Sequence, residues 1–140
     1  MLFSSDNITR LLPQRPPILM VSTLDEATET SAQTTLNVTA DNMFVTAGRL
    51  REPGILEHMA QSASVLAGYQ AYLKQQPAPV GYIGEVKKCA FITLPQVPCT
   101  LLTTVEILGT AAGVSLIKAS TNLPDGTQVC TTQMKIFVEQ

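Results

Sequence analysis

The sequence predicts an α+β fold in which an antiparallel sheet curls around one long central helix. Three observations predict it: a helical pattern over residues 54–75, strand-like runs on both sides of that pattern, and strand-like sequence alone after it. The expected helix is far longer than the ~11–12 residues of an average helix. Because its residues are apolar nearly all round, the helix can bury its surface only if the sheet covers it on several sides.

The residues before the long helix predict a short helix and a hairpin. A short helix is expected over residues 5–12, ended by Pro13, since proline disfavours helical backbone in the residue before it. Residues 18–28 and 31–40 alternate β-branched and polar side chains, which is typical of two paired strands. Residues 41–53 then form a polar loop that leads into the helix.

The residues after the helix predict a run of antiparallel strands. Pro77 and Pro79 end the helix, and Asp125-Gly126 is a strong hairpin signal because such a turn needs positive φ values. The expected strands are 80–91, 99–108, 114–122 and 128–139.

Length and composition predict one domain, residues 1–140, that assembles with other chains. Hydrophobic residues make up 45% of the sequence and charged residues 14%, so a monomer would have a surface poor in charge. We therefore expect a homodimer or a larger assembly. The net charge is −2 and the nine Lys and Arg residues are scattered, which argues against a nucleic-acid partner.

The cysteines and the N-terminus predict a cytoplasmic protein without a cofactor. Cys89, Cys99 and Cys130 are odd in number and lack CxxC spacing, as is typical of free thiols in a reducing compartment. We expect no signal peptide, because residues 1–9 lack a basic start and an apolar core, and no membrane span, because no apolar run reaches ~18 residues. Neither a metal-ligand cluster nor a phosphate-binding loop is recognisable, so no metal or cofactor is expected.

Glu57 is the first candidate for chemistry. A lone carboxylate in an apolar helix costs several kcal/mol to bury unless it is paired or protonated, so such positions are enriched in functional groups. The helix carries one stripe of polar and small residues at i, i+4, i+7 and i+11: Glu57, Gln61, Ser64 and Gly68. The stripe predicts a lined cavity or a partner. The alternative is a structural carboxylate bonded to backbone or to Arg49 or Arg51.

Three motifs resemble a known family. They are residues 11–21 (LLPQRPPILMV), residues 53–61 (PGILEHMAQ), and Tyr82-Ile83-Gly84 followed by Phe91 and residues 95–98. In this order and spacing they resemble the 3-hydroxyacyl-acyl-carrier-protein dehydratases of the hot-dog superfamily, over nearly the full chain. The resemblance implies a homodimer with an acyl tunnel beside the long helix. Glu57 matches the family's helix carboxylate.

The sequence departs from that family at its catalytic histidine. In the family a histidine, in a motif resembling Gly-His-Phe, works with the glutamate of the other subunit. The matching stretch here is Asn42-Met43-Phe44, which puts Met43 at the histidine position. A thioether cannot transfer a proton.

Other residues are therefore candidates for the missing roles. Dehydration needs a base for the α-proton, an acid for the hydroxyl and donors for the enolate oxygen. His58, the one histidine of the sequence, is a candidate second catalytic residue or else a satisfied core or interface histidine. It points about 100° away from Glu57 on a helix. The N–H groups of Gly54 and Ile55 could polarise the thioester carbonyl.

The remaining candidates are expected to line the substrate site. Gln61 and Ser64 either line the cavity or bind the facing strand, and Met43 and Phe44 close the pocket mouth. Three functions stay open. The first is a dehydratase-like hydro-lyase that acts on or binds acyl chains linked to acyl-carrier protein or coenzyme A, in fatty-acid or polyene-type synthesis. The second is an acyl thioesterase. The third is a non-catalytic acyl-binding subunit in a heteromer with an active homologue.

Overall fold

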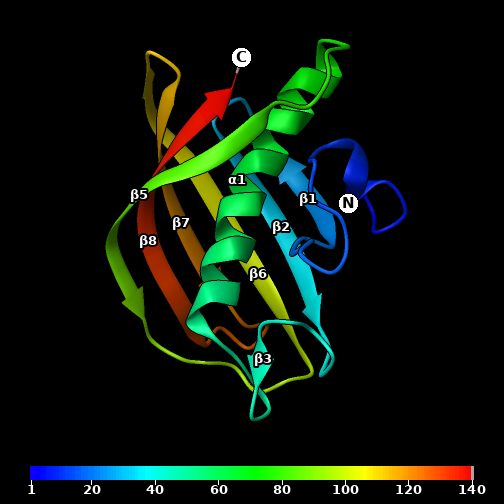
Figure 1. The fold of residues 1–140 in the computed structure, drawn as a ribbon, viewed down its shortest axis with the longest axis vertical. Coiled ribbons are helices and arrows are strands. Elements are labelled where there is room, and N and C mark those ends of the chain that lie inside the picture. Colours follow the sequence, from blue (N-terminus) through cyan, green and yellow to red (C-terminus); the bar gives the residue numbers. More distant parts are fainter. Residues whose placement is uncertain (140) are drawn as a thin grey trace.

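A computed structural model describes residues 1–139 as one curled antiparallel sheet wrapped around a single long helix (Figure 1). The expected α+β fold is thereby confirmed. The six strands are ordered β1-β2-β6-β7-β8-β5, so the strand that follows the helix in sequence lies at one edge. In chain order they are β1 (Thr23–Ala27), β2 (Ser31–Val38), β5 (Val80–Phe91), β6 (Cys99–Ala111), β7 (Val114–Asn122) and β8 (Gln128–Glu139).

Helix α1 (Glu52–Leu73) lies in the hollow of the sheet and has the expected length of 22 residues. It begins slightly earlier than residue 54, because Pro53 suits the first helical turn, where its missing N–H is no loss. Gly68 allows the preceding chain to lie directly on the helix: a Cβ there would come within 1.8 Å of the carbonyl oxygen of Leu11. No helix within residues 1–139 is both long and apolar enough to cross a membrane.

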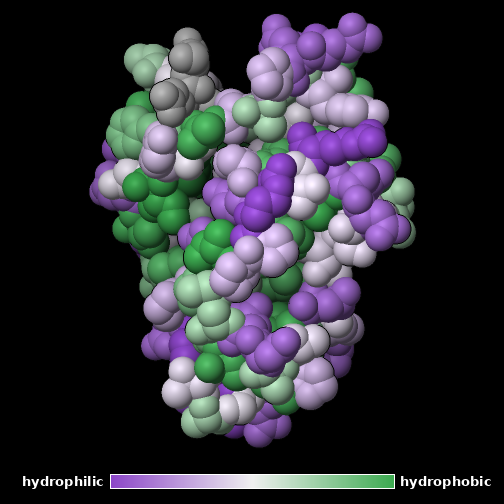
Figure 2. All heavy atoms as spheres, turned by 45° about the vertical axis from the view of Figure 1, so that its right-hand side comes forward, coloured by the Kyte–Doolittle hydropathy of each residue, from purple (hydrophilic) through white to green (hydrophobic). Residues whose placement is uncertain are grey.

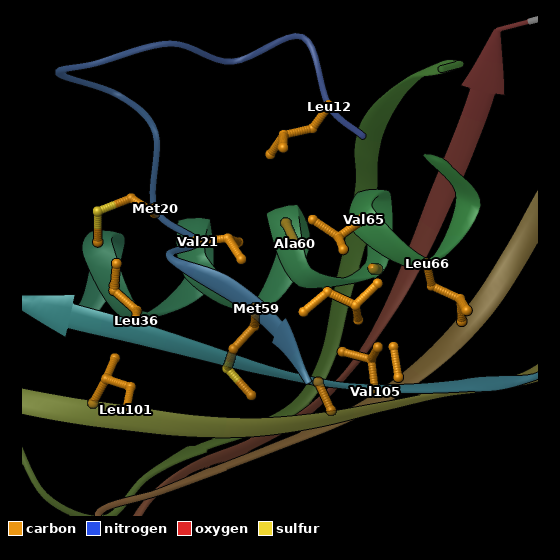
Figure 3. Packing of buried hydrophobic residues seen from close by; sticks show 14 of the residues in the cluster. Leu12, Met20, Val21, Leu36, Met59, Ala60, Val65, Leu66, Leu101 and Val105 are labelled. Carbon is orange, nitrogen blue, oxygen red and sulfur yellow. The ribbon is translucent and has the colours of Figure 1, made fainter. Parts of the chain in front are cut away.

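The core lies between α1 and the central strands. Met59 and Leu66 are fully buried and point from the helix toward β2 and β6 (Figure 3). The buried side chains that meet them from the sheet are Leu36, Leu101 and Val105. Burial of this kind stabilises the fold by about 1.5–3 kcal/mol for each large apolar side chain.

The N-terminal segment differs from the expectation in both of its elements. The short helix is only a 3-10 turn, η1 (Ile8–Arg10), and β1 begins at Thr23 rather than at residue 18. The reason lies in hydrogen bonding: the backbone of Ile18 and Met20 bonds to helix side chains instead of to a neighbouring strand. Residues 12–20 therefore form a strap across α1, which we call the N-terminal strap.

The expected polar loop over residues 41–53 contains a small hairpin. Its strands are β3 (Val45–Thr46) and β4 (Arg49–Leu50). The two residues between them, Ala47 and Gly48, both have positive φ, of 53° and 74°, as a tight two-residue hairpin turn requires. An alanine in that position gives little sequence signal, which explains why the hairpin was missed.

The two edges of the sheet differ in whether another segment of the chain bonds to them. At the β1 edge, Leu2 and Phe3 add backbone hydrogen bonds to Leu24. The outer edge of β5 has no strand beside it within residues 1–139. Hydrophobic side chains are exposed on the left of Figure 2, the side where β5 lies in Figure 1. On and next to β5 the exposed ones are Tyr82, Ile83, Val86, Phe91, Ile92 and, from β8, Phe137.

Candidate functional site

Glu57 is half-buried near the start of α1, and one of its oxygens is held by a neighbouring amide. Gln61 Nε2 donates a hydrogen bond of 2.8 Å to Glu57 Oε1. Gln61 is itself fixed by the N-terminal strap, since its Oε1 accepts from the Met20 N–H at 2.6 Å and its Nε2 donates to the Ile18 carbonyl at 2.8 Å. The carboxylate is thus held in place through an amide that cannot rotate freely.

The alternative role for Glu57, a structural bond to an arginine, does not match the contacts. Arg49 donates to the carbonyl oxygen of Leu94 at 2.6 Å, and Arg51 donates to that of Thr46 at 2.7 Å. The ion pairs seen within residues 1–139 involve Glu85 instead. Glu57 therefore faces a pocket with one oxygen engaged by an uncharged partner.

The pocket beside Glu57 lies between α1, the N-terminal strap and β5, and its volume is about 210 Å³. Gln61 and Ser64 line it, as the helical stripe predicts. The rest of its wall consists of Gln14, Ala60, Gly81, Tyr82, Ile83 and Ile136. A cavity of this size holds several atoms of an organic substrate beside the carboxylate.

The pocket continues along the helix as a narrow groove. Ser64, Gly81 and Ile136 also line a constriction of only about 30 Å³. That constriction shares Ala67 and Pro79 with a wider cavity of about 490 Å³ near the end of α1. From Glu57 to the end of the helix this groove along α1 is about 24 Å long, at 1.5 Å per residue.

Gly81 keeps the constriction open. A Cβ atom at this position would lie 3.3 Å from Ile136 Cγ2 and 3.4 Å from Ser64 Oγ. Any longer side chain would therefore point between α1 and β8, where the groove is narrowest. Ala63 and Ala67 keep the helix side equally small.

His58 is separated from Glu57 and lies in the core. It is fully buried, with Nδ1 2.7 Å from the Met20 carbonyl oxygen and Nε2 2.7 Å from Thr103 Oγ1. A carbonyl can only accept, so Nδ1 carries the proton and Nε2 accepts from the threonine hydroxyl. Burial lowers the pKa of His58 to about 4, and the hydrogen bond to Met20 offsets only part of that effect. The imidazole is thus neutral and fully engaged.

Four further candidates lie together at the start of α1 but do not line the Glu57 pocket. Phe44 packs on Gly54 so closely that a Cβ there would lie 2.4 Å from Phe44 Cβ. The N–H groups of Gly54 and Ile55 donate to the carbonyl oxygen of Arg51 as the helix begins. Met43 is 54% exposed on the preceding loop. The structure therefore groups these residues apart from Glu57, Gln61 and Ser64.

A comparison of the sequence with models of known protein families identifies a match over nearly the whole chain. A family model described as ApeP-like, ApeP dehydratase, matches residues 6–138. The chain belongs to the ApeP-like dehydratase family. No curated protein sequence matches it.

Solved structures resemble this ApeP-like chain in fold. The dehydratase heterocomplex ApeI:P from Xenorhabdus doucetiae contains a chain with a TM-score of 0.87 and 15% identity, covering 95% of this chain and 91% of that one. A hypothetical thioesterase with coenzyme A from Streptococcus pneumoniae has a TM-score of 0.67 and 10% identity, covering 84% of both chains. The PaaI protein of the E. coli phenylacetic acid degradation operon has a TM-score of 0.67 and 10% identity, covering 84% and 79%. These structures confirm a hot-dog fold.

Six residues of the ApeP-like site were not predicted from the sequence, and two of them, Gln14 and Gly81, matter most to its shape and polarity. Gln14 and Gly81 line the Glu57 pocket, although they lie far from Glu57 along the chain. The proline-rich stretch around Gln14 was recognised as a motif, which is a usable signal, whereas a lone glycine in a strand gives almost none. None of the three cysteines lines this pocket, and burial together with the neighbouring Cys89 raises the pKa of Cys130 to about 12.

Proposed function

We propose that this chain is the glutamate-bearing subunit of a 3-hydroxyacyl-thioester dehydratase, and that a homologous partner subunit supplies the histidine. The observation that carries the proposal is the opposite placement of two adjacent residues. Glu57 faces the groove, whereas His58, the one histidine of the sequence, is sealed in the core. The chain thus has one acid–base group beside a long cavity and lacks a second of its own.

The chemistry divides naturally between two subunits. A histidine of the partner removes the proton at C2 of the acyl thioester, and the electron pair forms the C2–C3 double bond as the C3–O bond breaks. Glu57, in its protonated form, gives its proton to the departing hydroxyl, which leaves as water. The products are a 2-enoyl thioester and water, and proton exchange with solvent restores both side chains.

The open edge of β5 is the surface we assign to that partner. Within residues 1–139 it combines a strand edge that has no neighbouring strand with exposed apolar side chains, a combination that proteins rarely leave uncovered. It also lies next to the pocket, since Gly81, Tyr82 and Ile83 belong to both. A partner docked here would bring its own residues to Glu57. The similarity to a chain of a dehydratase heterocomplex supports a heteromeric rather than a homodimeric assembly.

The substrate we propose is an acyl chain on acyl-carrier protein, in fatty-acid or polyene-type synthesis in the cytoplasm. The length of the groove and its small, mostly apolar constriction support an extended acyl chain. The choice of acyl-carrier protein over coenzyme A follows from the resemblance of the three sequence motifs. Cys89, Cys99 and Cys130 are free, in keeping with a reducing compartment.

The test is reconstitution of activity. The chain is purified alone and after co-expression with a histidine-bearing hot-dog homologue from the same genome, and each preparation receives 3-hydroxyacyl thioesters on acyl-carrier protein and on coenzyme A. We expect enoyl product only from the co-expressed pair, and none when the partner's histidine is replaced by alanine. Full turnover by the chain alone would contradict the division of labour. Release of free thiol without enoyl product would instead identify a thioesterase.

A further inference from the structure

Gln14 has a buried hydrogen-bonding atom that the protein leaves unused. Within residues 1–139, no hydrogen-bond partner reaches its Oε1, although this atom is shielded from solvent. Burying a polar atom without a partner costs about 1–3 kcal/mol, so such atoms are rare and often functional. Gln14 lines the same pocket as Glu57.

The backbone that carries Gln14 is held on both sides. Arg15 Nη1 donates to the carbonyl oxygens of Leu12 and Gln14, at 2.8 Å and 2.9 Å. Further along the N-terminal strap, Ile18 binds the amide of Gln61, which also holds Glu57. The N-terminal strap therefore ties the backbone beside Gln14 to the amide that holds Glu57, so both residues border the pocket from anchored segments.

We propose that Gln14 is a substrate-binding residue that accepts a hydrogen bond from the 3-hydroxyl group of the acyl thioester. This inference rests on the proposed dehydratase function. A hydroxyl has one donor and two acceptor lone pairs, and an amide oxygen can only accept. Because this oxygen is shielded from solvent, the Gln14 side chain turns toward the substrate on binding. With its hydrogen directed to Gln14, the hydroxyl then presents a lone pair to the protonated oxygen of Glu57.

The arrangement gives Gln14 and Glu57 different tasks in the same step. As the C3–O bond breaks, the leaving oxygen takes the proton of Glu57 and keeps its own hydrogen, which Gln14 still accepts. The oxygen departs as water, and Gln14 is chemically unchanged. Gln14 also distinguishes the hydroxylated substrate from a saturated chain, because only the former satisfies its buried oxygen.

Binding of two ligands tests this role directly. The ligands are a 3-hydroxyacyl thioester and the saturated acyl thioester of equal length, and the protein is used in the assembly in which it is isolated. A Glu57→Gln background prevents turnover. We expect Gln14→Leu to weaken binding of the hydroxylated ligand about twofold to tenfold, as for one lost hydrogen bond, and to leave the saturated ligand unaffected. Gln33→Leu, at an exposed position of β2, is the matched control.

Each other outcome has a definite meaning. Equal weakening of both ligands would make Gln14 a structural support of the strap, and unchanged binding of both would leave it without a role; either result overturns the inference. Dissociation of the assembly by Gln14→Leu would assign the residue to the partner interface instead. If the unsubstituted assembly binds neither ligand, the proposed function itself fails.

Discussion

Helix α1 has two polar faces, represented by the adjacent residues Glu57 and His58, that differ in whether their hydrogen bonds are all made within the protein. On the core face, His58 and Ser62 belong to a closed network: Ser62 donates to the carbonyl oxygen of His58 at 2.8 Å and lies 2.8 Å from Thr34 Oγ1. On the groove face, Gln61 holds one oxygen of Glu57, and Gln14 keeps an unused oxygen nearby. Polar groups whose hydrogen bonds are all made within the protein stabilise one packing. Polar groups beside a cavity that still lack a partner are available to a ligand.

The backbone of Met20 connects the two faces. Its N–H donates to Gln61 on the groove face, and its carbonyl accepts from His58 on the core face. The strap that holds Glu57 in place is thus anchored to the buried imidazole of His58. The closed face gives the open face its rigidity, which a catalytic carboxylate needs.

The largest effect is expected on the open face, from Glu57→Gln. Glutamine has nearly the same shape but cannot transfer a proton, so turnover of the reconstituted assembly should fall about 10²–10⁴-fold. The fold should persist, because Glu57 takes part in one hydrogen bond. The measurement is enoyl formation together with a thermal unfolding curve. Glu52→Gln, at an exposed position of the same helix, is the control. Undiminished turnover in a folded variant would remove Glu57 from the chemistry.

The closed face should instead control stability against pH. His58 is neutral in the fold, with a pKa lowered to about 4, but has a pKa near 6.5 when unfolded. Between these values the unfolded chain binds one more proton, so stability is full above pH 6.5 and falls as the pH drops toward 4. The loss should approach about 3 kcal/mol. Urea unfolding at pH 7 and pH 5 measures most of it.

His58→Gln is the matched variant for that experiment. An amide can donate to Met20 and accept from Thr103 without a charge to gain, so the steep loss of stability between pH 6.5 and 5 should flatten. Turnover at neutral pH should change far less than in Glu57→Gln. A rate loss equal to that of Glu57→Gln would show that His58 takes part in the reaction after all.

The comparison of the two faces also separates what local sequence can predict from what it cannot. Helical spacing alone predicts that Glu57, Gln61 and Ser64 share a face, because the period of the helix fixes their directions. The partners of His58 lie 38 and 45 residues away, in the strap and in β6. Only the assembled fold brings them together. For the same reason residues 18–20 have strand-like sequence but lie outside the sheet, since backbone groups of Ile18 and Met20 bond to side chains of α1.

The smallest predicted effect concerns the far end of the open face, at Gly81. A valine there would fill the constriction between Ser64 and Ile136, where even a Cβ lies 3.3–3.4 Å from its neighbours. Such overpacking typically costs about 1–3 kcal/mol, which for a bound chain corresponds to binding weakened by roughly 5-fold to 150-fold. The loss should affect only acyl chains long enough to pass the constriction, whereas short chains end before it. A series of thioesters of increasing length therefore distinguishes a blocked groove from a damaged fold.

Gly109→Val is the control, because a Cβ at that position meets no atom within 4 Å. Equal losses for short and long chains would show that the acyl group does not follow α1 past Gly81.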